Sequence, residues 1–280
     1  MSALSATRVA SVRTRHRRRP RVWRAAILVL AVIFFLGPLA ASVKYSLIQQ
    51  DGSLGFDNYL QIVKNADLRD ALFISLEIAG TAAFFVVALM LPTVVLVRLR
   101  LPKLTLLLEG VTILPIVVPP IVIAAGLAQL QASAPQWLVS LWFNHPLTAL
   151  APIYVVLAMP FTYRALDTGV RAIDLRTLVD ASRNLGASWF QTLTRVILPN
   201  VETAVLGAMF LTIALCLGEV VISTILIFVT LPVELIQAGA SNPGVSVALS
   251  VVSLLFVFLL LFALSFLARR RRGSASVRML

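Results

Sequence analysis

Hydrophobic residues in this chain gather in runs that are too long for the core of a soluble domain. Each run is close to the ~17–25 apolar residues that a helix needs to cross a bilayer. The runs lie at about 25–43, 71–97, 104–130, 147–163, 203–229 and 245–268. The pattern therefore predicts an all-α polytopic membrane protein with six transmembrane helices and no separate soluble domain.

Composition and charge agree with this prediction. The chain has 280 residues, of which 59% are hydrophobic and 13% charged, whereas soluble domains are ~45–50% apolar. A net charge of +12 could indicate a nucleic-acid partner, so the positions of the cations matter. If the N-terminus is cytoplasmic, 21 of the 24 lysines and arginines fall on that side, and only Lys44, Lys64 and Arg69 fall outside. This distribution indicates membrane orientation, with both termini cytoplasmic, and no nucleic acid as a partner.

The first 24 residues contain eight arginines and no acid. A basic start before an apolar run could be a signal peptide, but 25–43 is longer than the ~7–15-residue apolar region of such peptides. We therefore expect an uncleaved first helix. The predicted organisation is a basic cytoplasmic tail (1–24), a transmembrane domain (25–268) and a second basic cytoplasmic tail (269–280).

One polar and basic segment, about 164–199, separates the fourth and fifth apolar runs. Asp174 can cap a short amphipathic helix, and Gly186 can end it. Ser188 and Gln191 have the spacing of a capping box that opens a second helix, and Pro199 closes the segment. We expect a helix, a glycine turn and a helix, with Trp189, Phe190 and Leu193 facing outward toward a partner.

The same segment resembles a known motif. Asp180-Ala181-Ser182, Gly186 at a fixed spacing and the closing Val196-Ile197-Leu198-Pro199 are similar to the EAA loop of binding-protein-dependent ABC importer permeases, the MetI-like transmembrane domain. Three positions depart from the family pattern: Asp180 replaces Glu, Ser182 replaces Ala and Val196 replaces Ile. An ordinary amphipathic cytoplasmic loop would explain the helix and the charge but not this spacing.

The resemblance implies a permease subunit in a bacterial plasma (inner) membrane. It implies four kinds of partner: a cytoplasmic ABC ATPase dimer, a second permease subunit, an extracytoplasmic solute-binding protein and the lipid bilayer. ATP and Mg²⁺ would bind to the ATPase, and no cofactor to this chain. The residues that would couple to the ATPase are Asp180, Ala181, Gly186, Ala187, Trp189, Phe190, Leu198 and Pro199.

A second resemblance concerns the solute. The order of 218–223, 230–233 and 242–253 is similar to permeases of the spermidine/putrescine-type branch, which also includes phosphonate and ferric-ion importers. This favours a polyamine-type solute, with phosphonate, ferric ion or another small polar solute as alternatives. The Gly52–Tyr59 segment resembles a GLxNY-type piece found after the first span of such permeases. Its aromatic residues could contact an external binding protein, or Phe56 and Tyr59 could instead anchor the segment at the membrane interface.

Two acids and a proline pair are candidates for the translocation pathway. Glu77 is expected near the outer end of the second span, and Glu219 about 25 Å along the fifth helix, where acids must face protein or water. Each could instead bond a neighbouring helix. Pro119-Pro120 predicts a broken helix that lines the pathway, whereas Pro115 alone favours a simple kink.

No enzyme site emerges from the sequence. The chain has no GxxxxGK[ST] phosphate loop, and His16 and His145 have no metal-ligand companions. Cys216 lies in an apolar run and is most simply a packing residue. The rival interpretation is a secondary transporter driven by an ion gradient, with Glu77 or Glu219 as its proton site.

Overall fold

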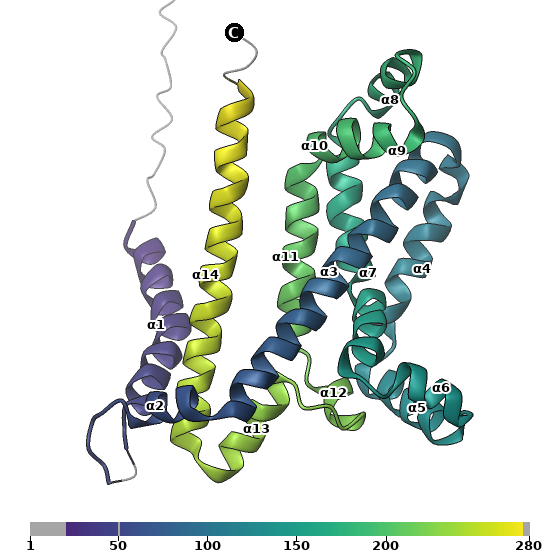
Figure 1. Ribbon diagram of the computed structural model, residues 1–280. Helices are drawn as coiled ribbons and strands as arrows, with labels where there is room; N and C mark the ends of the chain where they lie inside the picture. Colours follow the sequence, from purple (N-terminus) through teal and green to yellow (C-terminus); the bar gives the residue numbers. More distant parts are fainter. Residues whose placement is uncertain (1–20, 50, 277–280) are drawn as a thin grey trace, which may run out of the picture.

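The computed structural model describes residues 21–49 and 51–276, so most of the tail at 1–24 and the last residues of the tail at 269–280 lie outside the described residues. Six helices run along the length of the molecule (Figure 1): α1 (Arg21–Ser46), α3 (Ala66–Arg100), α4 (Thr105–Val117), α7 (Pro146–Arg171), α11 (Glu202–Gly218) and α14 (Pro243–Ser276). Shorter helices join them: α2 (Asp57–Lys64), η1 (Pro102–Leu104), α5 (Pro120–Ser133), α6 (Gln136–Trp142), α8 (Leu175–Asn184), α9 (Trp189–Gln191), the π-helical turn η2 (Thr192–Ile197), α10 (Leu198–Asn200), α12 (Val221–Ile225) and α13 (Leu231–Ser241).

The regular secondary structure of the described chain is helical, apart from one isolated bridge between Ile48 and Leu54. Three of its helices are long and apolar enough to cross a membrane, and two bent helix pairs raise the number to five. The last apolar run contributes a shorter apolar helix within its described part, Pro243–Leu259. The all-α polytopic fold is therefore confirmed, and the count of six spans stays a prediction.

The two ends of the molecule differ in what they carry (Figure 1). The start of α1 and the end of α14 lie at the same end as α8 and α9, which we call the inner end. The helices α2, α5, α12 and α13 lie at the opposite end, which we call the outer end. This arrangement agrees with two termini on the side of the polar segment. Which membrane side the inner end faces stays a prediction.

The core lies where α3, α7 and α11 pack against one another. The contacting faces are rich in small residues, which let helix backbones approach closely. Ala82 of α3, Ala158 of α7 and Ala208 of α11 are fully buried. One close approach is at Gly169 of α7, where an added Cβ would lie 2.3 Å from the Cβ of Ala204 on α11.

The third apolar run is broken, as Pro119-Pro120 predicts. Helix α4 ends at Val117 and α5 begins at Pro120, and the two axes differ by 85°. Pro115 lies inside α4 without ending it. A proline at the first position of α5 starts a helix without needing a backbone N–H donor, which explains why the pair, and not the single proline, marks the break.

Two other predicted spans are wrong in their bounds. The fourth, 147–163, continues in α7 for two more turns to Arg171, so Arg164 and Arg171 are helical residues and not parts of a loop. The fifth, 203–229, is helical only to Gly218, and the chain then turns into α12. Glu219 therefore stands at the end of α11 and not within a continuous helix.

Candidate functional site

The polar segment at the inner end begins with α8. The Asp174 carboxylate accepts from the backbone N–H of Thr177 at 3.3 Å and from its hydroxyl at 2.7 Å, as the sequence predicts for a helix cap. One face of α8, with Leu175, Val179 and Ser182, is buried. Asp180 and Ala181 lie on the exposed side. The cap and the apolar stripe together fix α8 against the bundle and leave its other face open.

A glycine turn follows α8. Gly186 has φ +83°, and an added Cβ would meet nothing within 4 Å, so the backbone conformation alone requires glycine here. The turn is closed by the backbone N–H of Ala187, which donates to the carbonyl of Ser182 at 3.1 Å. The guanidinium of Arg183 donates to the carbonyl of Ala187 at 2.7 Å. This hydrogen bonding makes the turn a defined elbow.

The second limb of the elbow starts with the predicted capping box. The Gln191 amide N–H donates to the Ser188 hydroxyl at 3.2 Å, and the Ser188 N–H donates to the Gln191 side chain at 2.8 Å. The hydroxyls of Ser182 and Thr192 lie 2.9 Å apart and join the two limbs. After η2 and α10, which contains Leu198 and Pro199, the chain bends by 84° into α11. We call residues 174–200 the elbow segment.

The outward residues of the elbow differ in part from the prediction. Phe190 is 73% exposed, as expected. Trp189 and Leu193 are half-buried and pack against the core, and the guanidinium of Arg100 lies 5.9 Å from the centre of the Trp189 ring. Leu185 is 89% exposed and was not predicted, because a leucine before a helix-ending glycine looks like a buried residue in sequence. The exposed apolar pair of the elbow is therefore Leu185 and Phe190.

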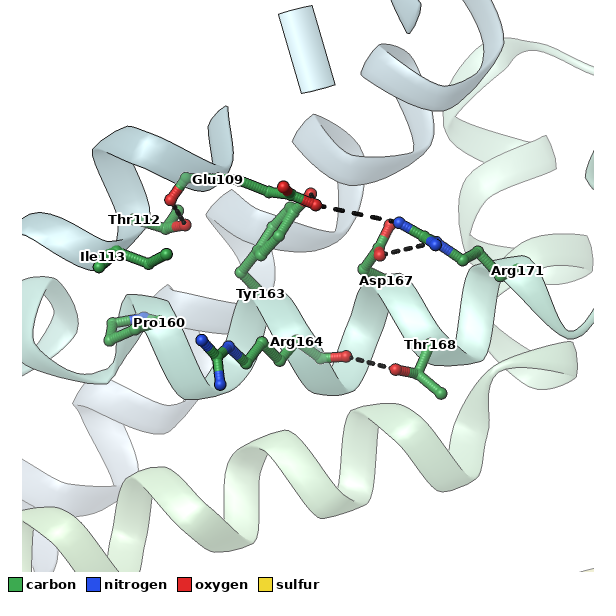
Figure 2. A pocket seen from close by; sticks show the side chains of 9 residues that line it. All are labelled: Glu109, Thr112, Ile113, Pro160, Tyr163, Arg164, Asp167, Thr168 and Arg171. Carbon is green, nitrogen blue, oxygen red and sulfur yellow. Dashed lines mark hydrogen bonds and ion pairs between the residues drawn. The ribbon is translucent and has the colours of Figure 1, made fainter. Parts of the chain in front are cut away.

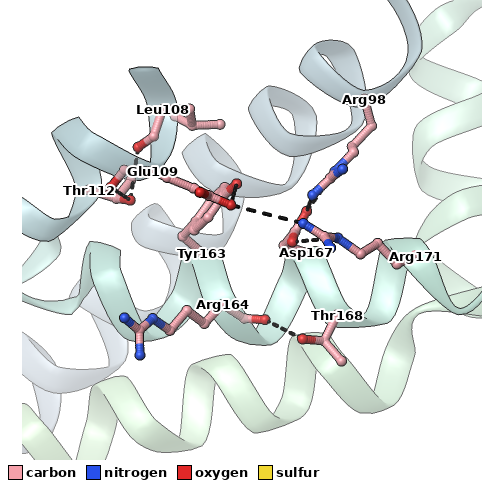
Figure 3. A network of polar contacts seen from close by, with 9 residues as sticks. All are labelled: Arg98, Leu108, Glu109, Thr112, Tyr163, Arg164, Asp167, Thr168 and Arg171. Carbon is pink, nitrogen blue, oxygen red and sulfur yellow. Dashed lines mark hydrogen bonds and ion pairs between the residues drawn. The ribbon is translucent and has the colours of Figure 1, made fainter. Parts of the chain in front are cut away.

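Directly behind the elbow, four charged side chains join three helices (Figure 3). The Arg98 Nε of α3 donates to Asp167 of α7 at 2.7 Å, and the Arg171 Nε lies 2.9 Å from the other carboxylate oxygen of Asp167. Arg171 also lies 3.9 Å from Glu109 of α4, which accepts from the Tyr163 hydroxyl at 3.4 Å. We call Arg98, Glu109, Asp167 and Arg171 the ion-pair network.

The sequence prediction did not include the ion-pair network. A signal was present: Tyr163, Asp167 and Arg171 recur every fourth residue, so they share one face of a helix if the helix continues past the apolar run. Asp167 is only 7% exposed, and two arginines balance its charge. The network makes α3 and α7 a connected pair at the point where α7 leads into the elbow.

A cavity of about 560 Å³ lies beside the network, between α4 and α7 (Figure 2). Its walls carry charged, hydroxyl and apolar side chains: Glu109, Thr112, Ile113, Pro160, Tyr163, Arg164, Asp167, Thr168 and Arg171. The hydroxyl of Thr112 donates to the Leu108 carbonyl at 2.9 Å, and that of Thr168 to the Arg164 carbonyl at 2.8 Å. Charged groups of this kind within a bundle of apolar helices mark a functional candidate.

The predicted pathway residues do not come together. Glu219 accepts from the backbone N–H of Val221 at 2.8 Å and of Ile222 at 3.0 Å, and from the Tyr154 hydroxyl at 2.9 Å. Its carboxylate thus caps α12. Glu77 is an exposed residue of α3, and Pro119-Pro120 form the α4–α5 break. That any of these residues lines the pathway stays a prediction.

Known proteins resemble the chain over most of its length. A family model for the binding-protein-dependent transport system inner membrane component matches residues 83–273, a range that includes the elbow segment, the ion-pair network and both helix breaks. The chain is 28% identical over 251 residues to the 2-aminoethylphosphonate transport system permease protein PhnV of Salmonella paratyphi A, covering 86% of this chain and 92% of the relative. It is 30% identical over 227 residues to a molybdenum ABC transporter permease protein of Haloferax volcanii, covering 77% and 79%.

Proposed function

The chain belongs to the family of binding-protein-dependent transport system inner membrane components, and from this premise we propose that it forms one half of the translocation pathway of an ABC importer. The family is a transport permease component and not an enzyme. The observation that supports a coupling role is the elbow segment, which is rigidly capped and yet exposes Leu185 and Phe190. Exposed apolar groups on a fixed scaffold are suited to bind another protein.

The partner of the elbow in this proposal is a separate ABC ATPase dimer, which binds ATP and Mg²⁺. A movement of the ATPase would reach the bundle through both ends of the elbow segment, since α7 leads into it and α11 leaves it. The ion-pair network passes the movement of α7 to α3. A second permease subunit would complete the pathway, and an extracytoplasmic solute-binding protein would deliver the solute to the outer end.

For the solute, we favour a small oxyanion over a polyamine. The similarity to a 2-aminoethylphosphonate permease and a molybdenum permease supports this choice. A phosphonate carries an oxyanion group, and molybdenum in aerobic water is present as the oxyanion molybdate. The preference for a polyamine rested on the resemblance to permeases of the spermidine/putrescine-type branch, and an acid such as Glu219 in the outer half would suit a cationic solute. That carboxylate is engaged by two backbone N–H groups and the Tyr154 hydroxyl, which weakens the argument for a cation. The polyamine remains the alternative for the uptake assay to decide.

The test replaces the glycine of the elbow. Gly186→Val places a β-branched residue at φ +83°, which costs roughly 1–2 kcal/mol and reshapes the turn. We expect the variant to insert normally but to retain little ATPase after purification, and to lose most ATP-dependent uptake. The measurements are the amount of nucleotide-binding subunit that copurifies and the initial uptake rate in proteoliposomes.

A matched control is available at the other end of the molecule. Gly52 also has φ +83° and open space around an added Cβ, so Gly52→Val introduces the same strain away from the elbow. It should retain the ATPase. If Gly186→Val and Gly52→Val copurify with equal amounts of ATPase, the elbow is not the coupling element. Uptake that needs an ion gradient and no nucleotide-binding subunit would support the secondary transporter instead.

A further inference from the structure

Arg164 lies in an unusual position for an arginine of an apolar helix. It precedes the end of α7 by about two turns, or roughly 10 Å. Figures 2 and 3 show its guanidinium on the Pro160 side of its own backbone, pointing away from Arg171 and the inner end. This is the direction that helical geometry favours, because side chains tilt toward the helix N-terminus. The guanidinium is therefore directed along α7 toward its N-terminal half and away from the inner end.

The surroundings of Arg164 give its charge no balancing acid. In the ion-pair network, the two arginines Arg98 and Arg171 balance the two acids Asp167 and Glu109. Within the described part of the chain, no acid lies within ion-pair distance of the Arg164 guanidinium. The hydrogen bond between Arg164 and Thr168 involves the backbone carbonyl of Arg164 and not its side chain. The charged residues that line the cavity, Glu109, Asp167, Arg164 and Arg171, sum to zero. Because Arg98 joins the network from outside the lining, Arg164 is the cation left without a paired acid.

Among the donor groups that line the cavity, the Arg164 guanidinium is one for which the described part of the chain shows no hydrogen bond or ion pair. The hydroxyl protons of Thr112 and Thr168 are used by backbone carbonyls, and the Tyr163 hydroxyl donates to Glu109. Arg164 is an exposed residue that lines the cavity, which at about 560 Å³ is large enough for a small solute. A planar guanidinium can donate two parallel hydrogen bonds to two oxygens of a phosphonate or molybdate group.

An arginine near a helix end commonly extends its side chain to the nearest membrane surface. Arg164 would have to point toward Arg171 to do so, which is opposite to the direction in Figure 2. An intramembrane arginine that faces a cavity instead of the surface is typical of a solute pathway.

We propose that Arg164 is an anion-binding residue in the inner half of the translocation pathway, and that it contributes selectivity for a solute with an oxyanion group. This inference rests on the proposed function. It adds a residue and a charge requirement that the elbow segment does not supply.

The test compares three variants of the assembled transporter in proteoliposomes, with 2-aminoethylphosphonate, molybdate and spermidine as probes. Arg164→Gln should lower the initial uptake rate of the transported oxyanion on the order of 10- to 100-fold, the range expected for losing a hydrogen bond to a charged group. Arg164→Lys should retain more uptake than Arg164→Gln, because it keeps the charge. Arg69→Gln, which removes an exposed arginine near the start of α3, should behave as wild type.

The outcomes separate this inference from the proposed function. Nucleotide-dependent uptake of spermidine that Arg164→Gln leaves unchanged or raises would overturn the anion site while keeping the importer. Equal loss in Arg164→Gln and Arg164→Lys would also overturn it, because charge would not be the cause. The absence of a copurifying ATPase would instead overturn the proposed function.

A second measurement does not depend on transport. In a Cys216→Ala background, Arg164→Cys should react with membrane-impermeant anionic thiol reagents, since Cys216, the single native cysteine, is buried and its removal leaves one thiol. The transported oxyanion should slow this reaction. A thiol at position 164 that does not react, in a complex that still assembles, would show that the position faces lipid or packed protein, contrary to the proposal.

Discussion

Asp167 and Glu219 are both acids within the bundle, but different groups balance their charges. Asp167 of α7 is paired with two arginines, one on α3 and one on its own helix. Glu219, after the last residue of α11, is bonded by the two N–H groups that open α12 and by Tyr154 of α7. The first arrangement fixes one helix relative to another, whereas the second mainly fixes a turn. The inner end thus holds a link between helices, and the outer end a locally determined break.

The difference suggests how the molecule can be stiff near the elbow and still contain broken helices. A break whose backbone groups are satisfied by a nearby carboxylate is stable without help from a distant helix. An ion pair between helices depends on both helices being in place. Substitutions at three places in the structure test this contrast, in order of decreasing effect.

The largest effect is expected from Asp167→Ala. The change leaves Arg98 and Arg171 without their shared acid, and breaking a buried pair in this way costs roughly 3 kcal/mol or more. We expect a lower thermal unfolding midpoint in detergent and weaker contact between α3 and α7. Asp180→Ala removes an exposed acid of α8 and should change stability by less than about 0.5 kcal/mol. Equal midpoints for the two variants would mean that the network does not connect the helices.

A smaller effect is expected from Glu219→Gln. The amide keeps one acceptor oxygen for α12 but loses the charge, so the cost should be about 1–2 kcal/mol, with assembly retained. Tyr154→Phe removes only the contact to α7 and should cost about 1 kcal/mol. Thermal unfolding of both single variants and of the double variant measures how much of the stability that Glu219 provides comes from capping α12 and how much from the contact to Tyr154. A Tyr154→Phe effect larger than that of Glu219→Gln would show that the distant contact, and not the cap, determines the break.

The smallest effect is expected from Ser188→Ala, which removes one half of the capping box. The loss should be about 1 kcal/mol and local, because the bond satisfies a single backbone N–H. Hydrogen exchange of peptides covering 185–195 should become faster, while exchange in α7 stays unchanged. Ser133→Ala, in an exposed serine of α5, serves as the control. Faster exchange throughout α7 would indicate that the elbow and the ion-pair network unfold together, which contradicts the expectation of a local effect.

The parts of the structure that follow from local rules could be read from the sequence. The caps at Asp174 and Ser188, the left-handed Gly186 and the break at Pro119-Pro120 each depend on residues within a few positions of one another. The hydrogen bonds and backbone conformations that these positions require do not depend on the rest of the chain. The predicted caps, the glycine turn and the break in the third apolar run are therefore confirmed, whereas Trp189 and Leu193 pack against the core and do not face outward.

The parts that depend on distant partners could not be read in the same way. Hydropathy ends the fourth span at the first charged residue, but α7 continues because Asp167 and Arg171 satisfy each other and are joined by Arg98 and Glu109 from other helices. Trp189 looks exposed in a polar segment, yet Arg100 and the core cover it. At the end of α11, Glu219 also accepts from the Tyr154 hydroxyl of α7, and no residue near Glu219 in the sequence predicts this contact.

The close approach of Gly169 and Ala204 has a mechanical consequence. Helices α7 and α11 leave opposite ends of the elbow segment, and at this point they nearly touch, with no room for even one methyl group on α7. A force applied to α8 is therefore distributed over two helices in contact and does not act on one helix alone. Such a pair resists bending more than either helix alone, so under the proposed function a displacement at the elbow would move α7 and α11 together.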